Sequence, residues 1–395
     1  MKSYIFGLLS VIISLSSYSQ EKNDNALFFL EPESHIAFVV PNYGAAPKAG
    51  ISFAESLSLG WQTQKDSSWQ SYYGFPQTGI QFTYLQTGNL DELGRQYSLN
   101  PFITFNKSLS EKSSLDFKLG LGVAYHTAPY DSLDNPKNQS IGGPVSWFFN
   151  ANMYYRYALS KRIHLKIGGG FWHASNGHTT LPNFGQNYAA FGIGLQYYPI
   201  DGNPYTRYNN HTSNREKHFY LRGGYGIGIQ EYGGTTGPKN GPKYITHAVT
   251  LSGAILFRKH LLVKSGLTYR YYDSYASSHD ENEFPDFSGG KGKAASNLIF
   301  FLGTELLFGH VSFDLQGGLN LWKPYFTHFY DHYEEHGRFD RGMKRFFNTR
   351  VGINLYAINT AKLPKHNVSI GAFMHANSGQ ADYTSIAVNY TCRLK

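Results

Sequence analysis

The residues that can do chemistry are grouped in one short stretch of the chain. His173, Ser175 and Asn187 supply the base, nucleophile and orienting group of a serine hydrolase. In that chemistry Ser175 attacks an ester, His173 takes the serine proton, and Asn187 holds the imidazole tautomer. Asn176 and the backbone N–H groups near Gly177 are the expected oxyanion donors. The simpler alternative is a strand that runs into a turn rich in Asn, Gly and Ser.

Two predicted β-strands position these residues. Apolar residues alternate with small or polar ones over 162–173 and 187–198, which predicts one lipid-facing side for each strand. His173 and Ser175 share the apolar face of the first strand, and Asn187 shares that of the second. We therefore expect the three side chains to converge on the outer surface of a β-barrel.

The expected orientation of such a barrel decides which end carries the cluster. With a periplasmic N-terminus, odd-numbered strands run outward, so the end of the seventh strand lies at the extracellular leaflet. Polar groups on a lipid-facing wall cost free energy, about 2–4 kcal/mol for a charge at mid-membrane and less near the interface. A His, a Ser and an Asn gathered there favour a functional explanation.

The same alternation recurs along the whole chain and predicts an all-β, antiparallel transmembrane β-barrel fold of about sixteen strands. It is clearest over 115–126, where one face is apolar and the other is small or polar, with His126 on the lumen side. The expected strands lie at 34–41, 52–62, 78–86, 97–107, 115–126, 145–158, 162–173, 187–198, 218–230, 244–258, 260–273, 295–308, 309–321, 348–358, 366–375 and 382–392.

Composition and targeting signals agree with an exported barrel. The 395 residues are 16% charged and 16% aromatic, whereas a soluble domain usually has about 25% charged residues. Residues 1–19 resemble a cleaved secretory signal, and the chain has no later apolar run of transmembrane-helix length. The lone Cys392 excludes an internal disulfide and a Cys-based zinc site. A net charge of +8 suits a phosphate-rich surface such as lipopolysaccharide, and no nucleic-acid partner is expected.

The two halves of the chain resemble each other. The segment Phe-Trp-His-Ala-Ser-Asn-Gly at 171–177 is echoed by Phe-Met-His-Ala-Asn-Ser-Gly at 373–379. We expect one eight-strand unit at 20–199, a polar connector at 200–217 and a diverged second unit at 218–395, closing either one wide barrel or two small ones. In the second copy His375 falls on the lumen side, and Asp382 takes the place of Asn187. We interpret this copy as structural.

The site motif resembles the active-site hairpin of the lipid A 3-O-deacylase (PagL-type) family, also called acyloxyacyl-hydrolase-like proteins. That family has His-x-Ser-Asn followed by Pro-Asn-x-Gly and an acidic residue. Here His173, Ser175 and Asn176 match the first part, and Pro182, Asn183 and Gly185 match the second. The resemblance implies an outer-membrane serine hydrolase that removes an ester-linked acyl chain from lipid A without a metal or other cofactor.

Two departures from the family pattern leave a second hypothesis open. Asn187 stands where the family has an orienting Glu, and it stabilises an imidazolium less than a carboxylate does. The turn reads Asn176-Gly177-His178 where the family more often has Asn-Ala-Gly. The alternative is a catalytically silent outer-membrane barrel that serves as a porin, transporter or structural protein. A soluble periplasmic β-protein is a remote third option, and a homodimer is left open.

Overall fold

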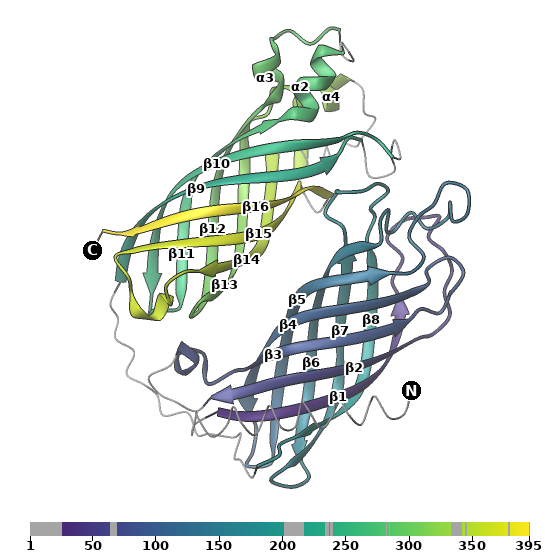
Figure 1. Cartoon of the computed structure of the whole chain (residues 1–395), viewed down its shortest axis with the longest axis vertical. Helices are drawn as coiled ribbons and strands as arrows, with labels where there is room; N and C mark the ends of the chain where they lie inside the picture. The colour runs from purple at the N-terminus through teal and green to yellow at the C-terminus, as the bar shows by residue number, and fades with distance from the viewer. Residues whose placement is uncertain are drawn as a thin grey trace. The chain divides into compact units, whose positions relative to one another are not determined.

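The chain forms two separate eight-stranded β-barrels in a computed structural model (Figure 1). The structure describes residues 26–63, 69–200, 217–233, 237, 240–281, 283, 285–332, 342–343, 346–377 and 380–394. In each barrel every strand pairs antiparallel with its neighbours, and the sheet closes on itself. Two small barrels therefore form, and the single wide barrel is excluded.

The first barrel is closed by pairing of its first and last strands, with Ala37 opposite Ala190. Its strands are β1 (Ala26–Val39), β2 (Ser52–Thr63), β3 (Gln77–Gln86), β4 (Arg95–Ser108), β5 (Ser113–His126), β6 (Val145–Ala158), β7 (Ile163–Ser175) and β8 (Gln186–Tyr197). A short 3-10 helix, η1 (Trp69–Tyr73), lies between β2 and β3.

Alternation along the strands separates a lipid-facing wall from a filled lumen. Outward side chains are apolar and exposed, as for Phe191 at 57% and Ile193 at 52%. Inward side chains are polar and buried, which is the expected pattern for a small transmembrane barrel. Among the residues that the structure describes, no helix is long and apolar enough to cross a membrane.

A charge-balanced network fills the lumen of the first barrel. Lys118 Nζ lies 2.9 Å from Glu31 Oε1 and 2.9 Å from Glu33 Oε2. Lys166 Nζ lies 2.8 Å from Glu31 Oε1. Buried charges are tolerated when they are paired in this way. The lumen is therefore a polar core rather than an open channel.

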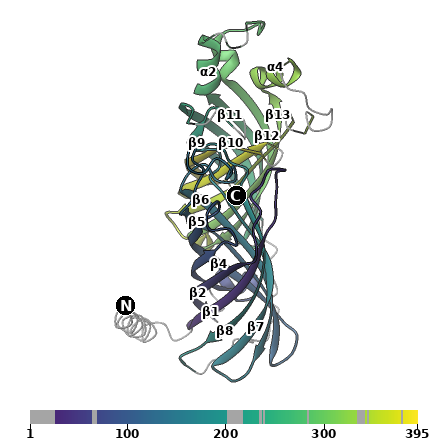
Figure 2. The same ribbon diagram turned by 90° about the vertical axis from the view of Figure 1, so that its right-hand side faces the viewer.

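The second barrel has the same number of strands but different connections. Its strands are β9 (Lys217–Glu231), β10 (Lys243–Phe257), β11 (Leu261–Tyr272), β12 (Ser296–Phe308), β13 (Val311–Trp322), β14 (Phe347–Tyr356), β15 (His366–Asn377) and β16 (Gln380–Arg393). The helices α2 (Asp273–Asp280), α3 (Lys291–Ala295) and α4 (Pro324–His332) follow β11 and β13, at one end of this barrel (Figures 1 and 2). A 3-10 helix, η2 (Thr360–Lys362), lies between β14 and β15.

Two features of the strands and loops were not predicted. The first strand begins at Ala26 rather than near residue 34, because the apolar run Leu27–Leu30 and Pro32 obscure the alternation. The described parts of the long loops at 274–294 and 324–346 contain helical segments. The expected secretory signal lies outside the described residues, as does the connector between residues 200 and 217.

Loop lengths distinguish the two ends of the first barrel. The connections at 40–51, 87–94, 127–144 and 176–185 share one end, whereas the four-residue turns 109–112 and 159–162 lie at the other. The described residues 69–76, between β2 and β3, contain η1 and precede β3 at the short-turn end. In transmembrane barrels the long loops face the outside of the cell and short turns face the periplasm. The candidate site lies at the long-loop end.

Candidate active site

His173 and Asn187 are direct cross-strand neighbours on β7 and β8. His173 Nδ1 lies 2.6 Å from Asn187 Oδ1. Both side chains are half-buried and lie on the outward side, in phase with exposed Phe171 and Phe191. The cross-strand pairing, set by strand alternation, therefore brings the imidazole and the amide together on the barrel's outer wall.

Ser175 ends β7 two residues after His173, and its hydroxyl contacts the following turn. Asn183 Nδ2 donates to Ser175 Oγ at 3.0 Å, and Asn183 Oδ1 lies 3.3 Å from the same oxygen. Within the described part of the chain, no hydrogen bond joins Ser175 to His173. The serine and the imidazole therefore share one strand end without contact in this conformation.

The two expected oxyanion donors are engaged within the turn. Asn176 Nδ2 donates to the carbonyl oxygen of Thr180 at 2.6 Å, and its backbone N–H donates to Asn183 Oδ1 at 3.1 Å. The Gly177 N–H donates to Ser175 Oγ at 3.3 Å. The Gly177 amide thus lies beside the serine, whereas the Asn176 side chain braces the turn. The oxyanion roles of both residues stay a prediction.

Asn183 belongs to the motif Pro182-Asn183-x-Gly185 but was not predicted as a site residue. Its side chain joins the serine at the end of β7 to the turn that leads into β8. The sequence contained a signal for this residue, because Pro182-Asn183-x-Gly185 follows Ser175 as the second part of the motif. Its contact with Ser175 depends on the fold of the turn, which strand alternation does not specify.

Gly185 is required where the turn returns to β8. It has φ +80°, in the region that side chains other than glycine seldom adopt. A Cβ atom at this position would lie 2.8 Å from His173 Cε1. The backbone therefore packs directly against the imidazole, and only glycine leaves room for it.

A comparison with protein families finds a match within the first barrel. The model of the family "Lipid A 3-O-deacylase (PagL)" matches residues 55–196. The first barrel is PagL-like. The matched range runs from β2 to β8 and includes the hairpin with His173 and Asn187. None of the curated proteins matches the chain. The barrel fold and the PagL match together indicate a protein of the outer membrane.

Several solved structures are similar to the chain at low sequence identity. The crystal structure of the outer membrane enzyme PagL is 15% identical, with a TM-score of 0.31, covering 43% of this chain and 99% of that one. Neisserial surface protein A is 13% identical, with a TM-score of 0.30, covering 44% and 97%. The NanC porin is 5% identical, with a TM-score of 0.16, covering 92% and 100%.

The second barrel does not repeat the PagL-like site. His375 faces the lumen, as predicted, and its Nε2 lies 2.9 Å from Ser385 Oγ. Although Asp382 aligns with Asn187 in sequence, Tyr383 lies opposite the imidazole, because the register shifts after His375. Asp382 instead accepts a hydrogen bond from Tyr272.

Proposed function

We propose that the PagL-like barrel is an outer-membrane serine esterase that removes an ester-linked acyl chain from the lipid A of lipopolysaccharide. The observation that carries the proposal is the hydrogen-bonded pair His173–Asn187 on the outer wall, with Ser175 two residues further along β7. The family match supports the substrate class, since it covers the strands that hold these residues.

The tautomer of His173 follows from its partner. An amide oxygen only accepts hydrogen bonds, so Nδ1 of His173 carries the proton that faces Asn187 Oδ1. The other nitrogen, Nε2, then has a free lone pair. This is the form of imidazole that can take a proton from a serine hydroxyl.

The reaction proceeds through an acyl-enzyme. Ser175 Oγ attacks the ester carbonyl while its proton passes to His173 Nε2, and the imidazolium returns that proton to the departing sugar oxygen. Water then attacks the acyl-serine by the same route and releases a fatty acid. The Ser175 hydroxyl must first turn away from Asn183, which holds it in the present structure. Catalytic contacts are often long in free enzymes and shorten when substrate binds.

The place of the site suits a lipid substrate. A pair on the outward wall at the long-loop end is reached from the bilayer rather than through the lumen. The lumen of this barrel is filled by paired charges, which argues against a porin function for it. An ester in the outer leaflet therefore meets the site from the membrane side.

A mass spectrum of lipid A from expressing cells tests the proposal. We expect wild type to remove one acyl chain and Ser175→Ala to remove none. Ser385→Ala is the matched control, because this serine forms a hydrogen bond with a histidine, His375, but lies in the second barrel. It should leave deacylation intact. Heat-modifiable gel mobility reports whether each variant is assembled.

A catalytically silent barrel is the second candidate, and one contact favours it. Ser175 Oγ is bonded to Asn183 rather than to His173, and the orienting residue is an amide. Unmodified lipid A in cells with fully assembled wild-type protein would select this candidate. Deacylation that persists in Ser175→Ala would instead exclude Ser175 as the nucleophile.

A further inference from the structure

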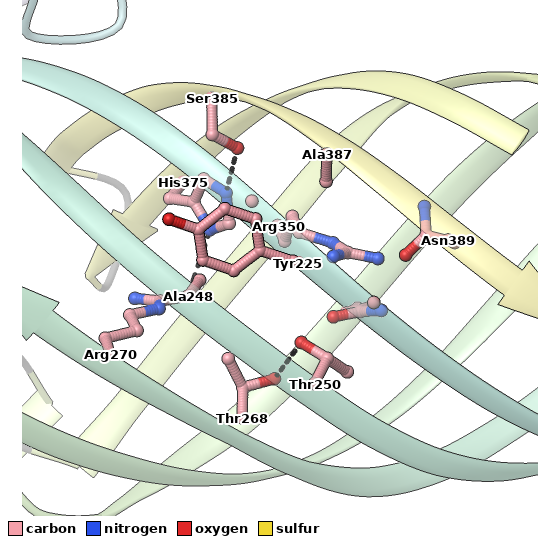
Figure 3. Close-up of a pocket in the computed structure, with 13 residues that line it drawn as sticks. Tyr225, Ala248, Thr250, Thr268, Arg270, Arg350, His375, Ser385, Ala387 and Asn389 are labelled. Carbon is pink, nitrogen blue, oxygen red and sulfur yellow. Dashed lines mark hydrogen bonds between the residues drawn. The ribbon is translucent and has the colours of Figure 1, made fainter.

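The lumen of the second barrel contains a small cavity (Figure 3). It has room for about one water-sized group. Its charged lining residues are two arginines, Arg270 and Arg350, and its lining includes no Asp or Glu. Hydroxyl and amide groups complete the polar lining: Thr250, Thr268, Gln316, Ser385 and Asn389. The cavity is therefore lined by cations and neutral hydrogen-bonding groups.

Both guanidinium groups have unused donors. Arg270 Nη2 donates to Asn348 Oδ1 at 3.0 Å, and Arg350 Nη2 donates to Asp314 Oδ2 at 3.1 Å. Among the described residues, however, the Nε groups of both arginines are buried without a hydrogen-bond partner. Unpartnered buried donors on a cation are costly, so a ligand that accepts from them would be stabilised.

The histidine between the arginines adds no positive charge. Arg270 Nη2 lies 2.9 Å from His375 Nδ1, and arginine can only donate. Nδ1 is therefore unprotonated, and the ring proton lies on Nε2 toward Ser385. His375 is thus a neutral group that fixes Arg270 at the edge of the cavity.

The lumen as a whole carries more cations than carboxylates. The described cations on the inward faces of its strands number four, Arg222, Lys264, Arg270 and Arg350, against three carboxylates, Glu305, Asp314 and Asp382. The carboxylates are shared: Asp314 contacts both Lys264 and Arg350. The first barrel differs, since its lumen sets Lys118, Arg156 and Lys166 against Glu31, Glu33 and Asp116. The excess on the strands of the second barrel is one positive charge.

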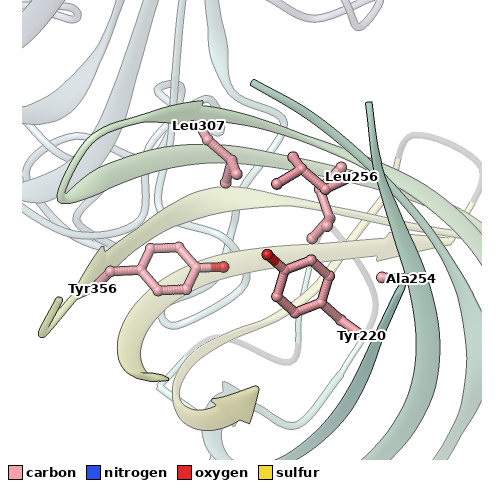
Figure 4. Close-up of a cluster of buried hydrophobic side chains, with 6 residues drawn as sticks. Tyr220, Ala254, Leu256, Leu307 and Tyr356 are labelled. Carbon is pink, nitrogen blue, oxygen red and sulfur yellow. The ribbon is translucent and has the colours of Figure 1, made fainter. Parts of the chain in front are cut away.

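An apolar cluster closes the short-turn end of this lumen (Figure 4). It consists of Tyr220, Ala254, Leu256, Leu262, Leu307 and Tyr356. Because these side chains are buried and mostly apolar, charges next to them interact in a poorly screened environment. In such an environment the excess positive charge of the lumen favours a bound counter-ion.

We propose that the cavity binds one small inorganic anion of about the size of chloride, held by Arg270 and Arg350. Two guanidinium groups supply charge, and hydroxyls such as Thr250 and Thr268 can rotate to donate. A neutral water would satisfy the donors but leave the charge excess. A sugar or an acyl chain is too large for the space.

Bromide diffraction and anion-dependent unfolding test this site in the full-length protein in detergent. In crystals soaked with sodium bromide we expect an anomalous peak between Arg270 and Arg350. The thermal midpoint, measured by heat-modifiable gel mobility, should be higher by ~2 °C or more in sodium chloride than in sodium gluconate at equal ionic strength. Gluconate is too large for the cavity and controls for general screening.

Variants that remove one positive charge distinguish anion binding in the cavity from anion effects at the protein surface. Arg350→Gln should abolish the difference between chloride and gluconate, whereas Arg258→Gln, in the exposed turn between β10 and β11, should keep it. If Arg350→Gln does not assemble, the wild-type bromide peak decides. Equal midpoints together with an absent peak would overturn the proposal in favour of bound water. A peak without any effect on the midpoint would mean an adventitious ion only, and would also overturn it.

Discussion

The hairpins β7–β8 and β15–β16 carry similar sequences but present their histidines to opposite environments. His173 lies on the outer wall and bonds Asn187, whereas His375 lies in the lumen between Arg270 and Ser385. Successive residues of a strand point to opposite faces, so a change of one position in strand phase moves a side chain across the wall. Similar sequences at the ends of two strands therefore do not imply that both strands carry the same site.

The hairpins also differ in what faces each histidine. Asn187 lies opposite His173 and offers it an oxygen. Tyr383 lies opposite His375 and stacks on it, with ring centroids 4.0 Å apart and planes at 9°. The His375 imidazole is stacked on Tyr383 and both of its ring nitrogens are hydrogen bonded, which suits a structural role. His173 uses Nδ1 to bond Asn187. Among the described residues, no hydrogen bond is made by its Nε2.

The largest expected difference between the hairpins is the effect of removing each imidazole. His173→Gln should lower lipid A deacylation about 10³-fold, because the general base is lost. His375→Gln should leave deacylation unchanged in assembled protein. The measurement is acyl release in mixed micelles, followed by mass spectrometry. Equal losses in both variants would show that the hairpins do not differ in function.

The next effect concerns the turn between β7 and β8 in the PagL-like barrel. In Gly185→Ala the new Cβ meets His173 Cε1 and the backbone keeps an unfavourable φ, which costs about 1–2 kcal/mol. We expect deacylation to fall about 10²-fold as the imidazole is displaced. Gly44→Ala, in the β1–β2 loop with open space around it, is the control and should retain full activity. Full activity in both variants would contradict the close packing.

The smallest effect sharpens the role of the orienting amide. Asn187→Glu places a carboxylate beside His173 Nδ1, and a charge-assisted hydrogen bond stabilises the imidazolium more than an amide does. We expect the deacylation rate to rise about tenfold. Initial rates at fixed substrate fraction measure it, with Asn187→Gln as the uncharged control of equal length. A rate that falls with Glu but not with Gln would count against imidazolium stabilisation as the limiting factor.

Strand alternation was sufficient to predict most of the fold. It placed His173 and Asn187 on the outer face and His375 in the lumen, because each depends only on the phase of one strand. It left open whether one barrel or two would form. That choice depends on the pairing of β1 with β8 and of β9 with β16, which are contacts between distant segments.

Local irregularities account for what the sequence did not reveal. The shift after His375 removes Asp382 from the position opposite it, and no alternation pattern marks such a bulge. The contact between Asn183 and Ser175 depends on a turn in which two successive residues, Gly177 and His178, have positive φ angles of +64° and +70°. The helices after β11 and β13 lie in loops, where β-periodicity carries no information.

The position of His173 on the outer wall has a kinetic consequence. An enzyme whose reactive groups face the lipid meets its substrate by two-dimensional diffusion in the membrane. Its rate therefore depends on the mole fraction of substrate in the surrounding lipid rather than on the bulk concentration. Diluting the bilayer with inert lipid slows such an enzyme even when the total amount of substrate is constant. Because the alternation of β7 places the His173 imidazole on the outer wall, the reaction rate depends on the mole fraction of substrate in the membrane.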